Sequence, residues 1–309
     1  MALEATTVRA GPGLRRAPAL SGAMSQLAAF ISLTKPRIIE LLLVTTLPTM
    51  VVAAHGWPPV RAVLVTLAGG TLSAGGANAA NMYLERDLDA MMRRTAHRPL
   101  VTGVVSPRAA LLFATSLEVV AFFSLWLGAN FLSASLALAA ALFYVFVYTA
   151  LLKRSSPQNI VIGGAAGAVP VLVGWAAVRG SLSWPPLLLF ALVFLWTPPH
   201  FWALAIRYRD DYAKANVPML PVVRSPTRTS AEITAYTFAT LAASFAFGAV
   251  AGMHWLYWLM AIAAGAVFAA LSLRLLRSPG PVLAMRVFHW SITYLSVVFV
   301  AMAVDVALR

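Results

Sequence analysis

Residues 62–82 read AVLVTLAGGTLSAGGANAANM, and residues 83–98 continue as YLERDLDAMMRRTAHR. The first part is an apolar run of 21 residues, and a helix of about 20 residues crosses a bilayer. The second part gathers three of the ten acidic residues of the chain and four of its arginines. Because charge is costly next to lipid, we expect this cluster to have a purpose. A metal-bound polyanion held at the membrane surface would account for both signs of charge.

The rest of the chain repeats the pattern of long apolar runs. Of its 309 residues, 61% are hydrophobic and 11% are charged, whereas soluble domains carry about 25% charged residues. The runs are continuous rather than alternating, which favours helices over barrel strands. The sequence therefore predicts an all-α polytopic membrane protein of about nine transmembrane helices. We expect them near residues 38–55, 62–82, 109–127, 131–151, 160–178, 187–206, 233–253, 256–275 and 287–307.

The distribution of basic residues predicts the orientation in the membrane. If the N-terminus is cytoplasmic, 20 of the 23 Lys and Arg residues fall on the inner side, and only Arg61, Arg179 and Arg309 fall outside. This bias follows the positive-inside rule. It predicts a multi-pass protein of the cell inner membrane, surrounded by lipid, with its C-terminus outside. The net charge of +13 is then topological, which argues against nucleic acid as a partner. The lack of cysteine excludes disulfides and thiolate chemistry.

The sequence predicts a tail and one membrane domain. Residues 1–28 are expected to be a disordered tail, and residues 29–309 a single transmembrane domain.

The two longest connections between the runs, 83–108 and 207–232, are both predicted on the cytoplasmic side. Both combine acidic and basic residues, so we expect a site to form where they meet.

The first connection carries Asn81, Glu85 and Asp89 at a spacing of i, i+4 and i+8. On a helix these side chains form one stripe. Two carboxylates and an amide are oxygen ligands of the kind that Mg²⁺ accepts when phosphate and water complete its shell. Arg94 and Arg98 follow at once, and arginine suits phosphate through its planar fork. The alternative is a solvated loop in which Asp and Arg simply pair.

The second connection offers Asp210, Asp211 and Lys214. Two acidic clusters on one membrane face can bracket a diphosphate through metal ions. An ion-pair network at a helix end is the alternative. Lys153 and Arg154 end the fourth run on the same face and are candidates for phosphate binding or for topology alone.

Three features inside or beside the runs have less specific interpretations. His200, which follows two prolines, could ligate a metal, act as a base or hydrogen-bond a freed backbone group. Lys35 and Arg37 flank the first run, and we interpret them mainly as topological. Glu118 lies within a run, where an acid is functional by default unless it lies near a helix end with a polar partner.

The motif Asn81-x3-Glu85-x2-Leu88-Asp89-x2-Met92-x-Arg94-Thr95-x2-Arg98-x4-Gly103 resembles the signature of the UbiA-type superfamily of membrane prenyltransferases. Further stretches resemble one branch of it, the protoheme IX farnesyltransferases (heme O synthases). These stretches are Leu33-Thr-Lys-Pro-Arg37, Tyr148-Thr-Ala-Leu-Leu-Lys153-Arg154, Asn159-Ile-Val-Ile-Gly-Gly164, Thr197-Pro-Pro-His-Phe-Trp202 and Asp211-Tyr-x2-Ala-x-Val-Pro-Met-Leu-Pro221. Together they cover most of the chain from about residue 30 onward.

This resemblance implies nine helices around a central cavity, with the active site at their cytoplasmic ends. It implies a Mg²⁺-dependent enzyme that transfers the farnesyl group of farnesyl diphosphate to heme B, giving heme O and diphosphate. Asn81, Glu85 and Asp89 would hold Mg²⁺–diphosphate, and Arg94 and Arg98 would contact the diphosphate. A heme A synthase or an oxidase assembly factor would be a candidate partner.

The second connection departs from the superfamily's Asp-x3-Asp pattern. Ala215 stands four residues after Asp211, and Lys214 stands four after Asp210. Asp210 and Asp211 are therefore candidate metal ligands, and Lys214 could replace a metal by contacting phosphate directly. For the heme, His200 is the first candidate, through iron or a propionate.

Three other functions remain open at this point. The same chemistry could act on a quinone precursor or another aromatic acceptor. A transporter would more typically place its charges at the bilayer midplane between broken helices. An oxidase assembly factor would not require the stripe of Asn81, Glu85 and Asp89.

Overall fold

The computed structural model describes residues 22–309 and, within that range, all side chains except those of 22–24, 37, 38 and 41. Every regular element in this part of the chain is a helix. Residues 1–21 of the predicted tail lie outside the described residues. The predicted domain boundary at residue 28 falls inside α1 (Gly22–Leu33), so the last residues assigned to the tail belong to a helix.

Nine long helical segments follow one another at the places that the apolar runs predicted in residues 22–309. They are α2 (Pro36–Ala54), α3 (Val60–Leu84), α5 (Pro107–Gly128), the continuous segment of α6 (Phe131–Leu142), η1 (Phe143–Leu152) and α7 (Lys153–Ser155), α8 (Asn159–Arg179), α9 (Trp184–Arg207), α12 (Pro226–Val250), α13 (Trp255–Arg277) and α14 (Pro281–Ala307). Eight are long and apolar enough to cross a membrane. The other, α2, has 19 residues with an apolar part over Leu42–Ala54. The predicted class, an all-α polytopic membrane protein, is confirmed, and the central cavity stays a prediction.

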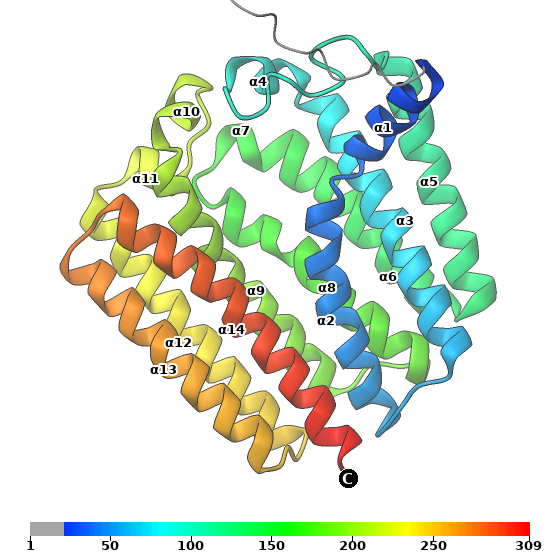
Figure 1. Cartoon of the computed structure of the whole chain (residues 1–309), viewed down its shortest axis with the longest axis vertical. Coiled ribbons are helices and arrows are strands. Elements are labelled where there is room, and N and C mark those ends of the chain that lie inside the picture. Colours follow the sequence, from blue (N-terminus) through cyan, green and yellow to red (C-terminus); the bar gives the residue numbers. More distant parts are fainter. Residues whose placement is uncertain (1–21) are drawn as a thin grey trace, which may run out of the picture.

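The short helices gather at one end of the bundle (Figure 1). They are α1, α4 (Arg86–Met91), α7, α10 (Arg209–Lys214) and α11 (Leu220–Val223). Residue 309 lies at the opposite end (Figure 1). The two long polar connections, between α3 and α5 and between α9 and α12, therefore meet the same face, as the sequence predicted.

Capping residues explain where several long helices begin. The Ser106 hydroxyl accepts a hydrogen bond from the Ala109 N–H at 3.2 Å, with Pro107 as the first residue of α5. Ser225 caps α12 in the same way, before Pro226. Serine at the cap satisfies an otherwise unpaired N–H group, and proline at the first position needs none. These signals start each helix next to a polar connection.

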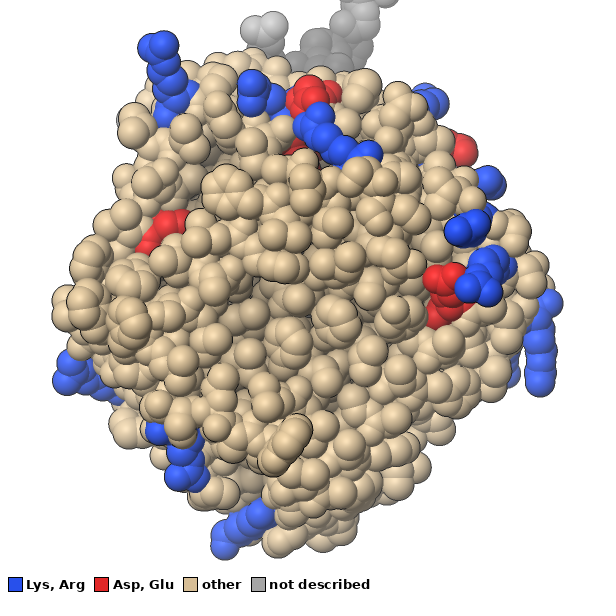
Figure 2. Space-filling model, turned by 180° about the vertical axis from the view of Figure 1, so that it is seen from behind, with Lys and Arg blue, Asp and Glu red and all other residues tan. Residues whose placement is uncertain are grey.

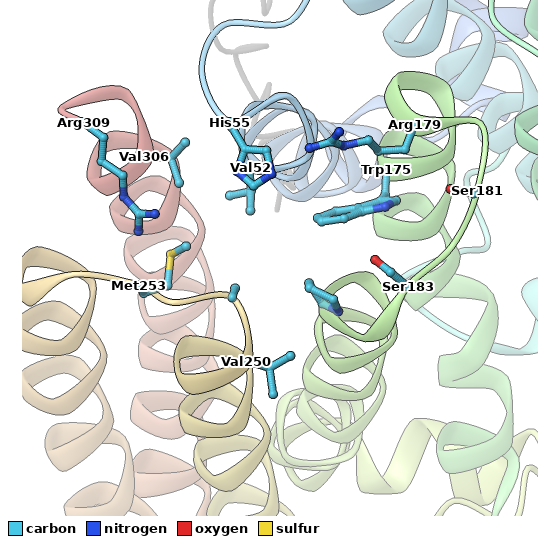
Figure 3. Close-up of a pocket in the computed structure, with 12 residues that line it drawn as sticks. Val52, His55, Trp175, Arg179, Ser181, Ser183, Val250, Met253, Val306 and Arg309 are labelled. Carbon is cyan, nitrogen blue, oxygen red and sulfur yellow. The ribbon is translucent and has the colours of Figure 1, made fainter.

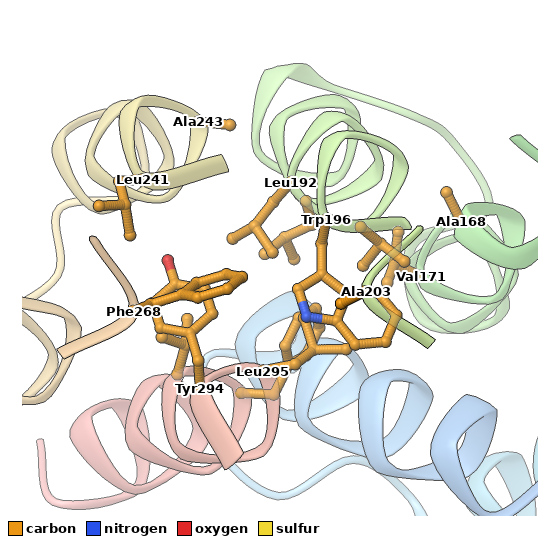
Figure 4. Packing of buried hydrophobic residues seen from close by; sticks show 14 of the residues in the cluster. Ala168, Val171, Leu192, Trp196, Ala203, Leu241, Ala243, Phe268, Tyr294 and Leu295 are labelled. Carbon is orange, nitrogen blue, oxygen red and sulfur yellow. The ribbon is translucent and has the colours of Figure 1, made fainter. Parts of the chain in front are cut away.

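The main core lies between α8, α9, α12, α13 and α14, where aromatic and aliphatic side chains interlock (Figure 4). Phe268 and Tyr294 pack with ring centroids 5.3 Å apart. The Trp196 indole donates to the Ser291 carbonyl at 2.8 Å, which satisfies its buried N–H. The outside carries few charges: in Figure 2 uncharged residues cover most of the visible face, and charged ones lie mainly toward its margins. Many large hydrophobic side chains are exposed, among them Leu112, Phe146 and Ile262. Such a surface suits lipid rather than water.

Candidate functional site

The three residues of the predicted stripe lie together where α3 passes into α4. Asn81 is in the last turn of α3, Glu85 lies between the two helices, and Asp89 is in α4. Backbone hydrogen bonds continue through the junction, from the Glu85 N–H to Asn81 O at 3.0 Å and from the Asp89 N–H to Glu85 O at 2.8 Å. The side chains therefore keep helical spacing and share one face. All three are buried, at 1%, 2% and 4% exposure.

Each side chain of the stripe is engaged by a different cation. The Lys35 ammonium donates to Asn81 Oδ1. Lys153 Nζ lies 2.5 Å from Glu85 Oε1, and Arg98 Nη1 lies 2.6 Å from Asp89 Oδ2. Charges can be buried when they are paired in this way, because pairing offsets much of the cost of desolvation.

The orientation of the Asn81 amide follows from its neighbours. Thr149 donates its hydroxyl proton to Tyr144 O at 2.9 Å. The Thr149 oxygen must then accept at 2.9 Å from Asn81 Nδ2. A hydroxyl has only one proton to give, so the amide nitrogen is fixed toward Thr149 and Oδ1 toward Lys35. The oxygen of the stripe is thus presented beside the two carboxylates.

The turn before α2 brings Lys35 to the stripe. Lys35 has φ 52° and ψ 63°, a left-handed conformation that costs about 1–2 kcal/mol for a residue with a side chain. Asn78 Nδ2 donates to the carbonyl of Thr34 at 2.9 Å and ties this turn to α3. A left-handed residue is common where a helix ends, and Lys35 lies just after the end of α1.

A π-helical segment, η1, positions Thr149 and Lys153. In a π-helix the backbone bonds run from residue i to i+5, and such segments are frequent at functional sites. Tyr144 and Tyr148 stack on one another with ring centroids 5.4 Å apart. Gly163 of α8 makes room for Tyr148, since a Cβ atom there would lie 2.2 Å from Tyr148 Cδ2. The close approach of α8 therefore supports the wall beside Lys153.

Burial and charge act against each other on the ionisable groups of the stripe. Burial lowers the pKa of Lys35 to about 7, although the nearby Glu85 charge opposes this. For Glu85, burial disfavours the ionised form, but the charges of Lys153 and Lys35 outweigh it and hold its pKa below the usual value. Glu85 is therefore a carboxylate at neutral pH.

Asp87 is separate from the stripe. It forms a two-pronged ion pair with Arg154, at 2.7 and 2.8 Å, and both side chains are about half exposed. The hydrogen bond from Arg154 is the main cause that lowers the pKa of Asp87. Arg154, a predicted diphosphate contact, thus lies on the rim and engages Asp87 instead of the stripe.

The second connection lies nearby but does not join the stripe directly. Asp210 and Lys214 are exposed, Asp211 is half-buried, and none of them forms an ion pair within residues 22–309. In the same range, no three acidic or histidine side chains cluster closely enough to hold a metal. The two connections meet through Arg94, whose guanidinium lies 5.8 Å from the Tyr208 ring centroid.

His200 lies apart, inside α9. Its ring stacks between Trp196 at 4.3 Å and Phe288 at 4.6 Å. The Ser291 hydroxyl lies 2.8 Å from His200 Nδ1 and 2.7 Å from the Phe288 carbonyl oxygen. Nδ1 is thus engaged by Ser291, and Nε2 is the ring nitrogen that this contact leaves available.

A cavity of about 330 Å³ opens at the opposite end of the bundle, near the last residue (Figure 3). Arg179 and Arg309 reach toward it, with His55 and Trp175 between them (Figure 3). Arg179 is the last residue of α8, where a cation offsets the helix dipole, and Arg309 lies two residues beyond the end of α14. Arg309 is held by Asp305 and the Gly252 carbonyl as well. The residues that line this cavity include none of Asn81, Glu85 and Asp89.

Three residues of the stripe's surroundings were not assigned to it from the sequence. Lys35 was interpreted as topological, and Asn78 and Thr149 were not singled out. Thr149 and Lys35 stand within the stretches Tyr148–Arg154 and Leu33–Arg37, which carried the family resemblance. That was the available signal, because nothing in the local composition shows which side chains will converge.

The oxygen set of the stripe fits a hard divalent cation. Two carboxylates and one amide oxygen on one buried face match the ligands that Mg²⁺ takes in proteins. The adjacent Lys35, Lys153 and Arg98 add positive charge suited to a phosphate group. Metal and polyanion could therefore be held at the same place.

Comparisons with known proteins agree with this chemistry. The model of the UbiA prenyltransferase family matches residues 42–297. A protoheme IX farnesyltransferase of Clavibacter sepedonicus is 53% identical over 289 residues, which cover 92% of this chain and 94% of that protein. Protoheme IX farnesyltransferase 1 of Saccharopolyspora erythraea is 55% identical, over 91% of this chain and 90% of its own.

Solved structures share the fold at low sequence identity. The structure of a digeranylgeranylglyceryl phosphate synthase superposes with a TM-score of 0.77 at 17% identity, covering 93% of this chain and 100% of that one. A UbiA homolog from Archaeoglobus fulgidus bound to GPP and Mg²⁺ gives a TM-score of 0.63 at 16% identity, covering 91% and 100%. By fold and by sequence, the chain belongs to the UbiA prenyltransferase family.

Proposed function

We propose that this membrane prenyltransferase transfers the farnesyl group of farnesyl diphosphate to a vinyl group of protoheme IX (heme B). Water adds in the same reaction, and the products are heme O and diphosphate. Support comes from two relatives named protoheme IX farnesyltransferase, which are 53% and 55% identical to this chain over about nine tenths of its length. The observation that carries the proposal is the buried stripe with its cations, which suits a metal–diphosphate group. Membership of a prenyltransferase family disfavours a transporter or an assembly factor.

We assign Asn81, Glu85 and Asp89 as the residues that hold Mg²⁺ with the diphosphate. Their shared, buried face and the fixed direction of Asn81 Oδ1 support this role. Asp210 and Asp211 are candidates for a second metal, held from the facing connection. When bound, the metal would supply positive charge to the leaving diphosphate.

The chain's own cations complete the diphosphate site in this proposal. Arg98 and Lys153 already lie at the stripe, and Arg94 lies between the two connections. As the bond between farnesyl C1 and oxygen breaks, its electron pair passes to the diphosphate, and these groups stabilise the added charge. Arg154 and Lys214 are exposed and would contact the diphosphate from the solvent side of the stripe.

The acceptor then supplies the electrons for the new bond. A vinyl carbon attacks farnesyl C1, water adds to the resulting cation, and one proton is released. Aromatic and aliphatic residues of the bundle would exclude other water, which would otherwise quench the farnesyl cation. We propose His200 as a heme contact, because Ser291 engages Nδ1 and leaves Nε2 available to iron or to a propionate.

The site would face the cytoplasm in the inner membrane. Support comes from the 20 of 23 basic residues that fall on this side when the N-terminus is cytoplasmic. Heme O would leave into the membrane, where a heme A synthase or an oxidase assembly factor is a candidate recipient.

A competition assay tests the acceptor. Membranes containing the chain are given farnesyl diphosphate and Mg²⁺ with equal amounts of heme B and 4-hydroxybenzoate, and the products are separated by chromatography. We expect a more hydrophobic heme and no prenylated phenol. Prenylation of the phenol alone would keep the reaction type and overturn the heme assignment.

A further inference from the structure

Each side chain of the stripe has its own basic partner. Lys35 engages Asn81, Lys153 engages Glu85, and Arg98 engages Asp89. The three cations come from separate parts of the chain: the turn before α2, the end of the fourth long segment, and the connection after α4. Two carboxylates thus face three basic groups, and one oxygen of each side chain in the stripe, Asn81 Oδ1, Glu85 Oε1 and Asp89 Oδ2, already has a basic partner.

This arrangement opposes the entry of a metal alone. A divalent cation could take Asn81 Oδ1, Glu85 Oε1 and Asp89 Oδ2 as ligands only by displacing these three basic groups. The side chains of Lys153 and Arg98 are only 17% and 16% exposed, so they could not regain full hydration. They would also be repelled by the metal at close range.

A diphosphate removes this obstacle. It brings about three negative charges, and it offers the displaced ammonium and guanidinium groups new oxygen partners. The same side chains that oppose metal alone would therefore favour metal with diphosphate.

We propose that Lys35, Lys153 and Arg98 couple metal binding to diphosphate binding, so that the chain takes up both as a unit and hardly binds either alone. This inference rests on the proposed function in one respect, the stripe as the metal–diphosphate site. It adds the way in which that site is loaded and emptied: when the reaction ends, diphosphate and metal leave together, and the cations return to the stripe.

The backbone at Lys35 supports this role. Asn78 holds the turn in place through the Thr34 carbonyl, and the Lys35 side chain is thereby kept in contact with Asn81. Arg154 offers a contrast, because it is exposed and pairs with Asp87 rather than with the stripe.

Equilibrium dialysis of the purified full-length chain in lipid nanodiscs tests the proposal. Radiolabelled Mn²⁺ and inorganic diphosphate are counted on the protein, each alone and both together. Because the free metal–diphosphate complex is equal in both chambers, only protein-bound label is scored. We expect Mn²⁺ to bind at least about tenfold more tightly with diphosphate, and diphosphate to gain the same factor from Mn²⁺.

The variants Lys35→Gln and Lys153→Gln remove one charge each and keep a hydrogen-bond donor. We expect each to bind Mn²⁺ alone about tenfold more tightly than the unchanged chain and to lose about tenfold of the coupling. Arg61→Gln is the matched control, since this exposed arginine lies in the first turn of α3, at the far end from Asn81. It should keep the original coupling.

Two results would overturn the proposal: Mn²⁺ binding by the unchanged chain that is as tight without diphosphate as with it, or Gln variants that bind Mn²⁺ alone no better than the unchanged chain. If one variant fails to fold, the other variant and the unchanged chain still decide the matter. The assay uses neither heme nor a prenyl chain. A different acceptor would therefore leave the coupling intact, and heme O formation without coupling would overturn this inference alone.

Discussion

Lys153 Nζ lies 2.5 Å from Glu85 Oε1, and this contact joins the end of the fourth long segment to the end of α3. The Glu85 side chain is 3% exposed and that of Lys153 17%, so the pair is mostly shielded from water. A pair of this kind contributes little net stability while intact, but its loss leaves an uncompensated charge. The contact thus links the fold to the site.

Loss of that lysine should be costly. We expect Lys153→Met to destabilise the chain by about 3 kcal/mol, because Glu85 would be left as an unpaired buried charge. Thermal unfolding in one detergent measures this. The double variant Lys153→Met/Glu85→Gln should be more stable than the sum of the single effects predicts. Simple additivity would show that the pair is not coupled.

The approach of α8 to Tyr148 gives a prediction about packing. Gly163→Ala should destabilise the chain by about 1–3 kcal/mol, because the new Cβ atom would lie 2.2 Å from a ring carbon. Gly167→Ala, on the same helix, is the control, since nothing lies within 4 Å of its added methyl. It should be neutral or slightly stabilising. Equal melting temperatures for the two variants would contradict the close packing of α8 on η1.

The protonation of Lys35 should affect how the stability of the chain depends on pH. Burial lowers its pKa from 10.5 to about 7, so between these pH values the unfolded chain holds a proton that the folded chain has lost. Stability then rises with pH across this window, and below pH 7 the full cost of the buried charge is present. We expect Lys35→Gln to remove this part of the rise in melting temperature between pH 7 and pH 10. Parallel curves for the variant and the unchanged chain would exclude the shifted pKa.

Ser291 should act on the acceptor rather than on the donor. Without the Ser291 hydroxyl, His200 loses the hydrogen-bond partner that orients its ring through Nδ1. Partners of this kind typically contribute about 10-fold to 100-fold in ligand affinity. We expect Ser291→Ala to raise the KM for heme about 10-fold and to leave the KM for farnesyl diphosphate unchanged. An equal rise in both KM values would indicate general damage to the fold.

Sequence patterns sufficed for the long helices because lipid demands continuous apolar runs, and these can be counted. They also gave the shared face of Asn81, Glu85 and Asp89, since helical spacing is local. The partners of these residues were beyond such reasoning. Lys35 meets Asn81 across 46 residues, and Lys153 meets Glu85 across 68. Contacts at that separation depend on how helices pack, and the left-handed turn at Lys35 has no marker in composition.

The most direct test compares two aspartates of α4 that differ in their surroundings. Asp89 is buried in the stripe, whereas Asp87 is exposed and pairs with Arg154. In a membrane assay with farnesyl diphosphate, heme B and Mg²⁺, heme O formation is measured for Asp89→Asn and Asp87→Asn. We predict a loss of about 100-fold or more for Asp89→Asn, as expected when a metal ligand is removed, and a change within about twofold for Asp87→Asn. If Asp89→Asn kept as much activity as Asp87→Asn, with both near that of the unchanged chain, the stripe would not be the metal–diphosphate site.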